Sequence, residues 1–294
     1  MHTLAMSEPF IGSEAVAAGA LFKTALRSRY RRLFPDVYIN RESDLTAIVL
    51  AKAGWLWSGR NAVVAGRSAA AMLGADWITA DTAVDLIHRN RNVPSGIKTH
   101  ADRITDDQVI SIDGVPVTSP ARTALDLGCW YQLGRAVACL DALARATRFD
   151  PDEAADLAAR YPGRRGIRGA RRALSLLDGG AQSPKETWLR LILIEAGLPR
   201  PATQIPVHDS AGTLIAYLDM GWPDLMVAVE YDGEQHRTDR RQYTWDLRRL
   251  ELLEQLGWIV IRVVAGDRRE DILRRVRAAI ARRTLRQSHA ERSA

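Results

Sequence analysis

Hydrophobic and polar residues follow a helical pattern at the start of the chain and a strand pattern in its middle. The stretch 13–39 is basic and helical in character and ends in "RRLFPDVYI", where a Pro-Asp turn leads into a short strand. This combination is typical of a helix-turn-helix unit that closes with a wing, although a generic helical subdomain fits it as well. From 82 to 117 the apolar residues fall in short runs, and Asp113-Gly114 marks a hairpin turn. Further helices are expected at 44–53 and 66–73, and from the Ser119-Pro120 start to about 177.

After a Gly-rich linker at 178–184, the pattern predicts the element order α-β-β-β-α-β-α. Ser183 and Pro184 begin a helix that Gly197 ends. Short connections make the next three strands an antiparallel meander, and a helical crossover places the fourth strand parallel to the third. The strands are expected at 203–207, 214–219, 225–232 and 258–264, and the remaining helices at 243–255 and 269–285. The expected fold class is therefore α/β in this half and α+β over the whole chain.

Size and composition limit the cellular compartment in which the protein is expected and the partners that it is expected to bind. A chain of 294 residues with 47% hydrophobic content can form two domains, each with its own core. No stretch is long and apolar enough to cross a membrane, and the N-terminus lacks a signal-peptide pattern, so we expect a cytoplasmic protein with no membrane partner. Cys129 and Cys139 lack metal-ligand spacing, so neither a disulfide framework nor a zinc site is expected.

Positive charge is concentrated in one segment. The net charge is +6, and "RYPGRRGIRGARR" at 160–172 carries six arginines and no acid. Arginine forks suit phosphate oxygens, so a nucleic-acid contact is one interpretation of this segment. A solvated helix face is the other.

The apolar run 225–229 leads directly into carboxylates. Because side chains alternate along a strand, Glu230 and Asp232 point to the same side, and Asp219 at the end of the neighbouring strand can reach that space. Four further residues are expected near these acids, on the flanking helices, on the last strand or at the rim: Glu186, Asp246, Arg262 and His236.

Carboxylates gathered at one sheet edge repel one another unless a positive group meets them. One outcome is a raised pKa, and another is a divalent cation: hard oxygen ligands suit Mg²⁺ or Mn²⁺, which can activate water for attack on a phosphodiester. His236 would then act as a general acid or base, or orient the phosphate. In the structural alternative, Glu230 pairs with Arg262 or Arg249, and Asp232 only opens the turn.

Several motifs of the C-terminal half resemble a known nuclease family. "SPKETWLRLILIEAGLPRPATQIPV", "YLDMGWPDLMVAVEYDGEQH", "DLRRLELLEQLGW" and "VIRVVAGD" resemble the very-short-patch-repair-like (Vsr-like) endonuclease domain of the PD-(D/E)xK superfamily. The resemblance covers 183–285 and implies a restriction-endonuclease-like αβββαβ domain. It implies Asp219 and Glu230 as metal-binding catalytic acids, with Asp232, His236 and Glu186 assisting and Asp246 and Arg262 as accessory residues. Asp232 stands where many superfamily members carry a lysine, which leaves the water-activating group open.

The N-terminal half resembles a different family. "RYRRLFPDVYI", "GRSAAAMLGA" and "IDGVPVTSPARTALDLG" resemble AbiEi-type antitoxins and transcriptional regulators, which begin with a winged helix. The resemblance implies a winged-helix-like DNA-binding region at 1–60, followed at 61–178 by a mixed α/β region and a basic helical connector. The arginines expected to contact nucleic acid are Arg27, Arg29, Arg31 and Arg32 in the first region, and Arg164, Arg165 and Arg168 in the connector.

These observations support two functions from different classes. The first is a Mg²⁺- or Mn²⁺-dependent DNA endonuclease that the N-terminal region delivers to duplex DNA. The second is a non-catalytic, antitoxin-like transcriptional regulator whose C-terminal domain binds DNA or dimerises. Both would have DNA as a partner and allow a homodimer, and a toxin-antitoxin partner protein is a further alternative.

Overall fold

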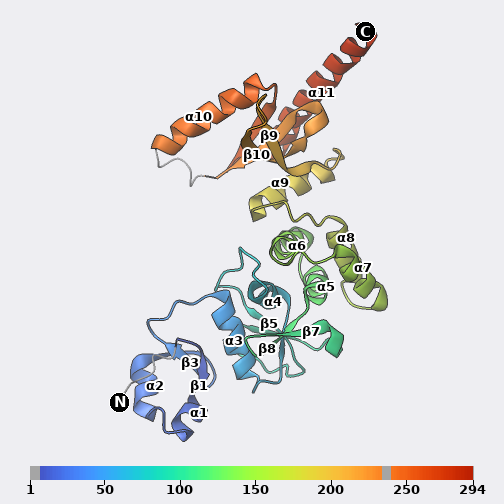
Figure 1. Cartoon of the computed structure of the whole chain (residues 1–294). Coiled ribbons are helices and arrows are strands. Elements are labelled where there is room, and N and C mark those ends of the chain that lie inside the picture. Colours follow the sequence, from blue (N-terminus) through green and yellow to red (C-terminus); the bar gives the residue numbers. More distant parts are fainter. Residues whose placement is uncertain (1–6, 234–239, 294) are drawn as a thin grey trace. The chain divides into compact units, whose positions relative to one another are not determined.

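The computed structural model describes residues 7–233 and 240–293, with side chains left undescribed at 240–247 and 286–293. The chain forms two compact units, one ending at Gly179 and the other beginning at Gly180 (Figure 1). This division falls inside the linker predicted at 178–184. The elements belong to mixed sheets and to helices, so the predicted α+β class is confirmed.

The first unit begins with a small three-stranded sheet and two short helices. A single helix was expected over most of 13–39. Instead α1 (Gly12–Ala17) and α2 (Lys23–Arg29) are separated by a turn, and the chain enters β2 (Tyr30–Phe34) directly after α2. β2 forms a hairpin with β3 (Val37–Asn40), and β1 (Phe10–Ile11) adds to β3 in the order β1-β3-β2. The order along this region is therefore a short strand, two short helices and a hairpin.

A five-stranded mixed sheet forms the centre of the first unit. Its order is β6-β5-β4-β8-β7, with parallel pairs β5–β6 and β4–β8 and antiparallel pairs β4–β5 and β7–β8. Asp113 and Gly114 have φ of 50° and 76°, so the predicted hairpin turn between β7 and β8 is confirmed. The elements are α3 (Ala47–Trp57), β4 (Val63–Val64), α4 (Gly66–Met72), β5 (Val84–Ile87), β6 (Ile97–His100), η1 (Asp106–Gln108), β7 (Val109–Ile112) and β8 (Val115–Thr118).

Four helices complete the first unit. Ser119 Oγ accepts a hydrogen bond from Arg122 N, and Pro120 is the first helical residue, as the sequence predicts. The helices are α5 (Pro120–Trp130), α6 (Leu133–Thr147), α7 (Pro151–Arg160) and α8 (Ile167–Ser175). α5 packs on α6, α7 and α8, so it is the central helix of this layer.

The second unit has the predicted order α-β-β-β-α-β-α. Its sheet runs β12-β11-β10-β9, and β12 is parallel to β11. The third strand begins later than expected, because Pro223–Leu225 form a 3₁₀ turn and Met226 takes a left-handed conformation. The elements are α9 (Pro184–Glu195), β9 (Ala202–His208), β10 (Leu214–Trp222), η2 (Pro223–Leu225), β11 (Val227–Asp232), α10 (Arg240–Gln255), β12 (Ile259–Val264) and α11 (Arg269–Ser293).

Helices cover both faces of this second sheet. On one face, side chains of α9 and α11 pack with Met220, Val229 and Ile261. On the other, Leu253 of α10 packs with Leu218 and Ala228 (Figure 1). Within the described residues, no helix has both the length and the apolar character that a membrane span requires.

Candidate functional site

Asp219 and Glu230 lie side by side on neighbouring strands of the second unit. β10 and β11 pair antiparallel, and the pairs Gly221–Ala228 and Met220–Val229 leave Asp219 and Glu230 as the next residue on each strand. The backbone N–H of Tyr231 donates to Asp219 Oδ2 at 2.9 Å. Strand pairing therefore brings together the two acids that the nuclease resemblance implies as metal ligands.

Glu186 belongs to the same acidic cluster, but it also has a structural role. Its side chain is buried at the start of α9, where its backbone N–H donates to Ser183 Oγ at 3.1 Å. Its Oε2 accepts from the backbone N–H of Gln182 at 2.8 Å. Side chain and backbone thus satisfy each other across the first turn, as in a capping box. The Ser-x-x-Glu spacing carried this signal, which the sequence analysis missed.

The crowding of these acids changes the protonation of Asp219. Burial, followed by the neighbouring charge of Glu186, raises the pKa of Asp219 from 3.8 to about 7, and Glu230 acts in the same direction. The Tyr231 N–H and Arg249 oppose this rise in pKa without cancelling it. Asp219 is therefore a carboxyl group that titrates near neutral pH, a property found at many functional sites.

Arginines neutralise the other two strand acids. Arg249 of α10 donates to both carboxylate oxygens of Glu230, through Nη1 at 3.3 Å and through a closer contact from Nη2. Arg262 Nη2 donates to Asp232 Oδ2 at 2.5 Å. Of the two partners considered for Glu230, the structure has Arg249. Arg262 is the partner of Asp232, which the sequence analysis did not foresee.

The carboxylate oxygens of this site are ligands of the kind that a hard divalent cation prefers, but their arrangement is not that of a complete metal site. Among the described residues, no three His, Cys, Asp or Glu side chains are placed to hold one metal ion. The carboxylates of Asp219 and Glu230 have the oxygen chemistry that Mg²⁺ or Mn²⁺ prefers, and a cation would relieve the repulsion that raises the pKa of Asp219. Arg249 would have to withdraw from Glu230 first. His236 and the side chain of Asp246 lie outside the described residues.

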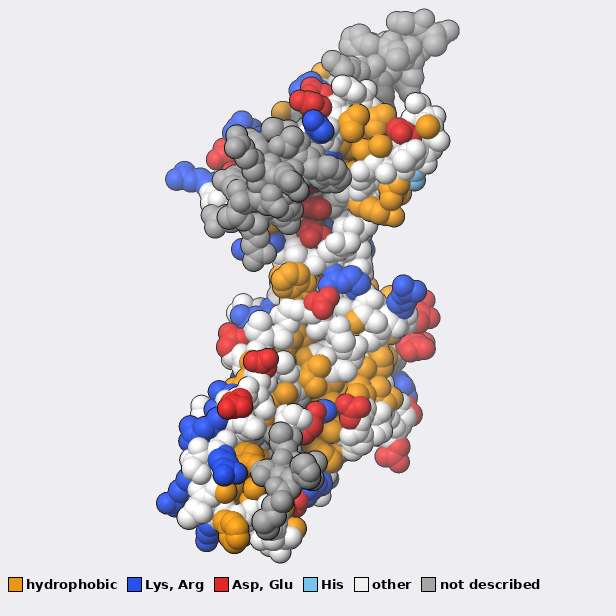
Figure 2. Space-filling model, turned by 60° about the vertical axis from the view of Figure 1, so that its left-hand side comes forward, with side chains coloured by type: hydrophobic (Ala, Val, Ile, Leu, Met, Phe, Trp, Pro, Cys, Tyr) orange, Lys and Arg blue, Asp and Glu red, His pale blue; other side chains and the backbone are white. Residues whose placement is uncertain are grey.

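Basic side chains are exposed around the two short helices of the first unit. Arg27 and Arg29 are exposed on α2, and Arg32 is exposed on β2. Arg31 is half-buried and donates to the carbonyl of Ser43 at 3.2 Å. In Figure 2, Lys and Arg side chains (blue) gather at the lower end of the first unit, the height at which Figure 1 shows α1 and α2, and acidic side chains are sparse there.

The basic connector divides into exposed and buried arginines. Arg165 and Arg168 are exposed, as a nucleic-acid contact requires. Arg164 is not: its side chain is 8% exposed, and it donates to Asp126 at 2.6 Å and to Asp102 at 3.1 Å. The prediction that Arg164 contacts nucleic acid is therefore wrong, because its guanidinium is held by buried Asp126 and by half-buried Asp102.

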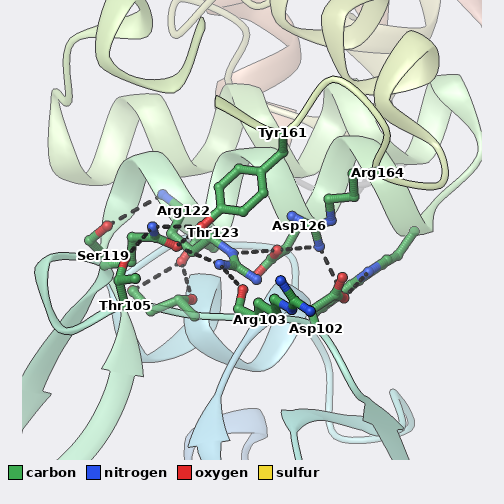
Figure 3. A network of polar contacts seen from close by, with 12 residues as sticks. Asp102, Arg103, Thr105, Ser119, Arg122, Thr123, Asp126, Tyr161 and Arg164 are labelled. Carbon is green, nitrogen blue, oxygen red and sulfur yellow. Dashed lines mark hydrogen bonds and ion pairs between the residues drawn. The ribbon is translucent and has the colours of Figure 1, made fainter. Parts of the chain in front are cut away.

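Arg164 is part of a polar network beneath α5 (Figure 3). Arg122 and Asp126 are both buried and form an ion pair at 2.8 Å, and Arg122 also donates to the carbonyl of Arg103 at 2.9 Å. Asp102 Oδ2 accepts from Trp130 Nε1 at 3.2 Å as well as from Arg164. The network joins α5 to the loop after β6 and to the segment before α8. Sequence spacing predicted none of its long-range pairs.

Comparison with known proteins identifies the class of the central part of the chain. Residues 62–179 match the family described as AbiEi antitoxin C-terminal domain, which spans the five-stranded sheet and the four helices that follow it. This confirms the antitoxin-like part of the predicted resemblance.

Two relatives extend this result to most of the chain. Over 241 residues, the chain is 31% identical to "Uncharacterized protein MT2308" of Mycobacterium tuberculosis (strain CDC 1551 / Oshkosh), and it matches "Uncharacterized protein Rv2248" of strain ATCC 25618 / H37Rv equally well. Each alignment covers 82% of this chain and 87% of the relative. The chain therefore belongs to the family of these mycobacterial proteins, and its residues 62–179 match the AbiEi antitoxin C-terminal domain. No solved structure matches it.

Proposed function

We propose that this protein is an antitoxin-like DNA-binding regulator. The observation that carries the proposal is the match to the AbiEi antitoxin domain at 62–179, which is preceded by α3 and, before it, by a basic region of two short helices and a hairpin. Arg27 and Arg29 on α2, and Arg32 on the adjoining strand, are exposed residues. Such a surface suits the phosphates and the major-groove edges of duplex DNA. A protein partner from a toxin-antitoxin pair is part of this proposal.

The regulatory proposal is tested by DNA binding of the full chain. Systematic selection from a random duplex pool would supply the preferred site, and fluorescence anisotropy would give Kd at several salt concentrations. Replacing Arg27 and Arg29 by Ala should weaken binding by about tenfold or more and lower the slope of log K against log salt by about 2. Arg135→Ala, an exposed arginine on α6, is the matched control and should leave both values unchanged. Equal losses in both variants would contradict the assignment of α2.

A second candidate function is metal-dependent cleavage of DNA phosphodiesters by the second unit. The acidic cluster of Glu186, Asp219 and Glu230 favours it, because burial, together with the neighbouring charges of Glu186 and Glu230, raises the pKa of Asp219 to about 7. Asp219 and Glu230 would hold Mg²⁺ or Mn²⁺, which when bound supplies an activated water and stabilises negative charge on the phosphate. Asp232 and Glu186 would position these ligands, and Arg249 would release Glu230 and turn toward the phosphate.

Plasmid nicking with Mg²⁺ or Mn²⁺ tests the second candidate. Asp219→Asn keeps an oxygen that can accept from the Tyr231 N–H but removes the charge, so cleavage should fall at least 100-fold. Asp271→Asn, an exposed acid at the start of α11, is the matched control and should cleave like the parent chain. Cleavage that persists in Asp219→Asn, or that EDTA does not inhibit, would exclude a metal-dependent active site at Asp219 and Glu230. A gel shift without cleavage would exclude the nuclease function and retain only the regulatory function.

A further inference from the structure

A cavity in the antitoxin-like domain combines basic side chains with an ordered histidine. It has a volume of about 640 Å³ and opens at the ends of β5 and β6, where the loop after β6 closes one side. Its charged and ionisable lining consists of His88, Arg89, His100, Asp102 and Arg103. This volume lies within the range of small-molecule sites and exceeds what one phosphate group needs. Neither proposed function uses this cavity.

His100 is fixed in place from two directions. Its Nε2 lies 3.2 Å from Oδ1 of Asp85, which is fully buried. Its ring stacks on Trp130 with centroids 3.4 Å apart and planes 7° from parallel. Because a carboxylate only accepts, Nε2 carries the hydrogen, and Nδ1 is the ring atom left for a ligand. No partner for Nδ1 occurs among the residues that the structure describes.

Asp85 is itself held so that it cannot turn away from His100. Its Oδ2 accepts from the backbone N–H of Arg67 at 3.1 Å and from the hydroxyl of Tyr131. A buried carboxylate that orients an imidazole from behind is the arrangement by which proteins present the other ring nitrogen in a defined direction. The core of the domain thus supports one side chain of the cavity wall.

The charge that the cavity offers to a ligand is positive. Asp102 is the acid in the lining, and its Oδ2 is already occupied by Trp130 Nε1 and by Arg164 Nη2 (Figure 3). Arg89 and Arg103 are exposed, and neither forms an ion pair within the described part of the chain. Two guanidinium groups that form no ion pair within the described residues match the charge and the acceptor oxygens of a phosphate group.

We propose that this cavity binds a phosphorylated ligand of nucleotide size. Arg89 and Arg103 bind the phosphate, His100 Nδ1 makes a hydrogen bond to the sugar or the base, and the His88 ring contacts the base. A free nucleotide and the 5′-phosphorylated end of a strand share this chemistry. The inference rests neither on the DNA-binding surface of α2 nor on the acidic cluster, so its failure would leave both of those proposals untouched.

The test is calorimetric titration of the full chain, in EDTA, with adenosine 5′-monophosphate, the 5′-phosphorylated dinucleotide pApA, and adenosine. We expect both phosphorylated probes to saturate and adenosine to bind at least tenfold more weakly. A dinucleotide that binds tenfold more tightly than the mononucleotide identifies a strand end as the source, and equal affinities identify a free nucleotide.

Variants tie the binding to this cavity. The double variant Arg89→Ala and Arg103→Ala should weaken both phosphorylated probes at least tenfold, since it removes both charge-assisted contacts to the phosphate. His100→Phe keeps a ring to stack on Trp130 but removes the ring nitrogens, and it should weaken binding with no change in thermal midpoint beyond a few degrees. Arg135→Ala is the control and should bind like the parent chain. Unchanged affinity in the double variant, equal affinity for adenosine, or no saturation at millimolar probe would overturn the proposal.

Discussion

Asp219 makes stability of the second unit depend on pH in a direction opposite to that of most acids. Its pKa is about 7 in the folded chain against an ordinary 3.8, so the folded state keeps a proton that the unfolded state loses. The folded state therefore binds more protons between these two values, and stability falls as pH rises from about 4 to about 7. Above about pH 7, the full free-energy cost of ionising Asp219 in the folded state is present.

The size of the penalty follows from the pKa difference. A shift from 3.8 to about 7 is about 3 units, or about 4 kcal/mol at most, because one unit corresponds to about 1.4 kcal/mol. At pH 5, about 2 kcal/mol of this free-energy cost is present. Asp219→Asn removes the titrating group and keeps an oxygen for the Tyr231 N–H. The substitution should therefore stabilise the second unit by up to about 4 kcal/mol at pH 8 and by about 2 kcal/mol at pH 5.

Hydrogen exchange measured by mass spectrometry on the full chain can isolate this effect. Peptides that cover β10 and β11 report the opening free energy of the strands that carry the acids. Exchange should slow in Asp219→Asn, and more at pH 8 than at pH 5 after correction for the intrinsic rate. Peptides from β5 and β8 in the first unit serve as the internal control. A gain that does not depend on pH, or a loss at pH 8, would refute the proposed crowding of charge.

Two further predictions concern the first unit and are checked by urea unfolding. Arg164→Met leaves buried Asp126 without one of its two arginine partners and should cost about 3 kcal/mol, whereas Arg165→Met, at an exposed position, should cost less than about 0.5 kcal/mol. Equal costs would contradict the buried network. Gly166→Ala combines φ of +85° with a Cβ only 2.2 Å from Cys129 O and should cost about 3 kcal/mol or more. The control Gly114→Ala shares a positive φ but has open space around it, so it should cost about 1 kcal/mol.

Local signals predicted most of the secondary structure. The Ser119-Pro120 and Ser183-Pro184 starts, the Asp113-Gly114 turn and the order α-β-β-β-α-β-α all depend on residues close together in sequence. The N-terminal helix was predicted too long, because a basic stretch with few turn residues looks helical although β2 pairs with β3. β11 was predicted to begin too early for a related reason: Met226 takes a left-handed conformation, which an apolar run does not indicate.

Part of each candidate site could likewise be predicted from local sequence signals, and part could not. Strand alternation and the short β10–β11 connection were enough to predict that Asp219 and Glu230 meet. Sequence could not say which arginine pairs with which acid, because Arg249 and Arg262 reach their partners only after α10 and β12 have packed on β11. It also placed Arg164 with its exposed neighbours, although residues distant in sequence bury it.

The sequence by itself determined the order of the elements, the α+β class and the positions along the chain where charge is concentrated, because these follow from local preference and periodicity. Only the tertiary structure decided what each charge does. Burial turns Asp219 into a group that titrates near pH 7 and Arg164 into a core residue, and the fold unites Asp85, His100 and Trp130 from β5, β6 and α5 beside one cavity. Desolvation and the distances between residues remote in sequence set these properties, and neither can be predicted from the local pattern of hydrophobic and polar residues.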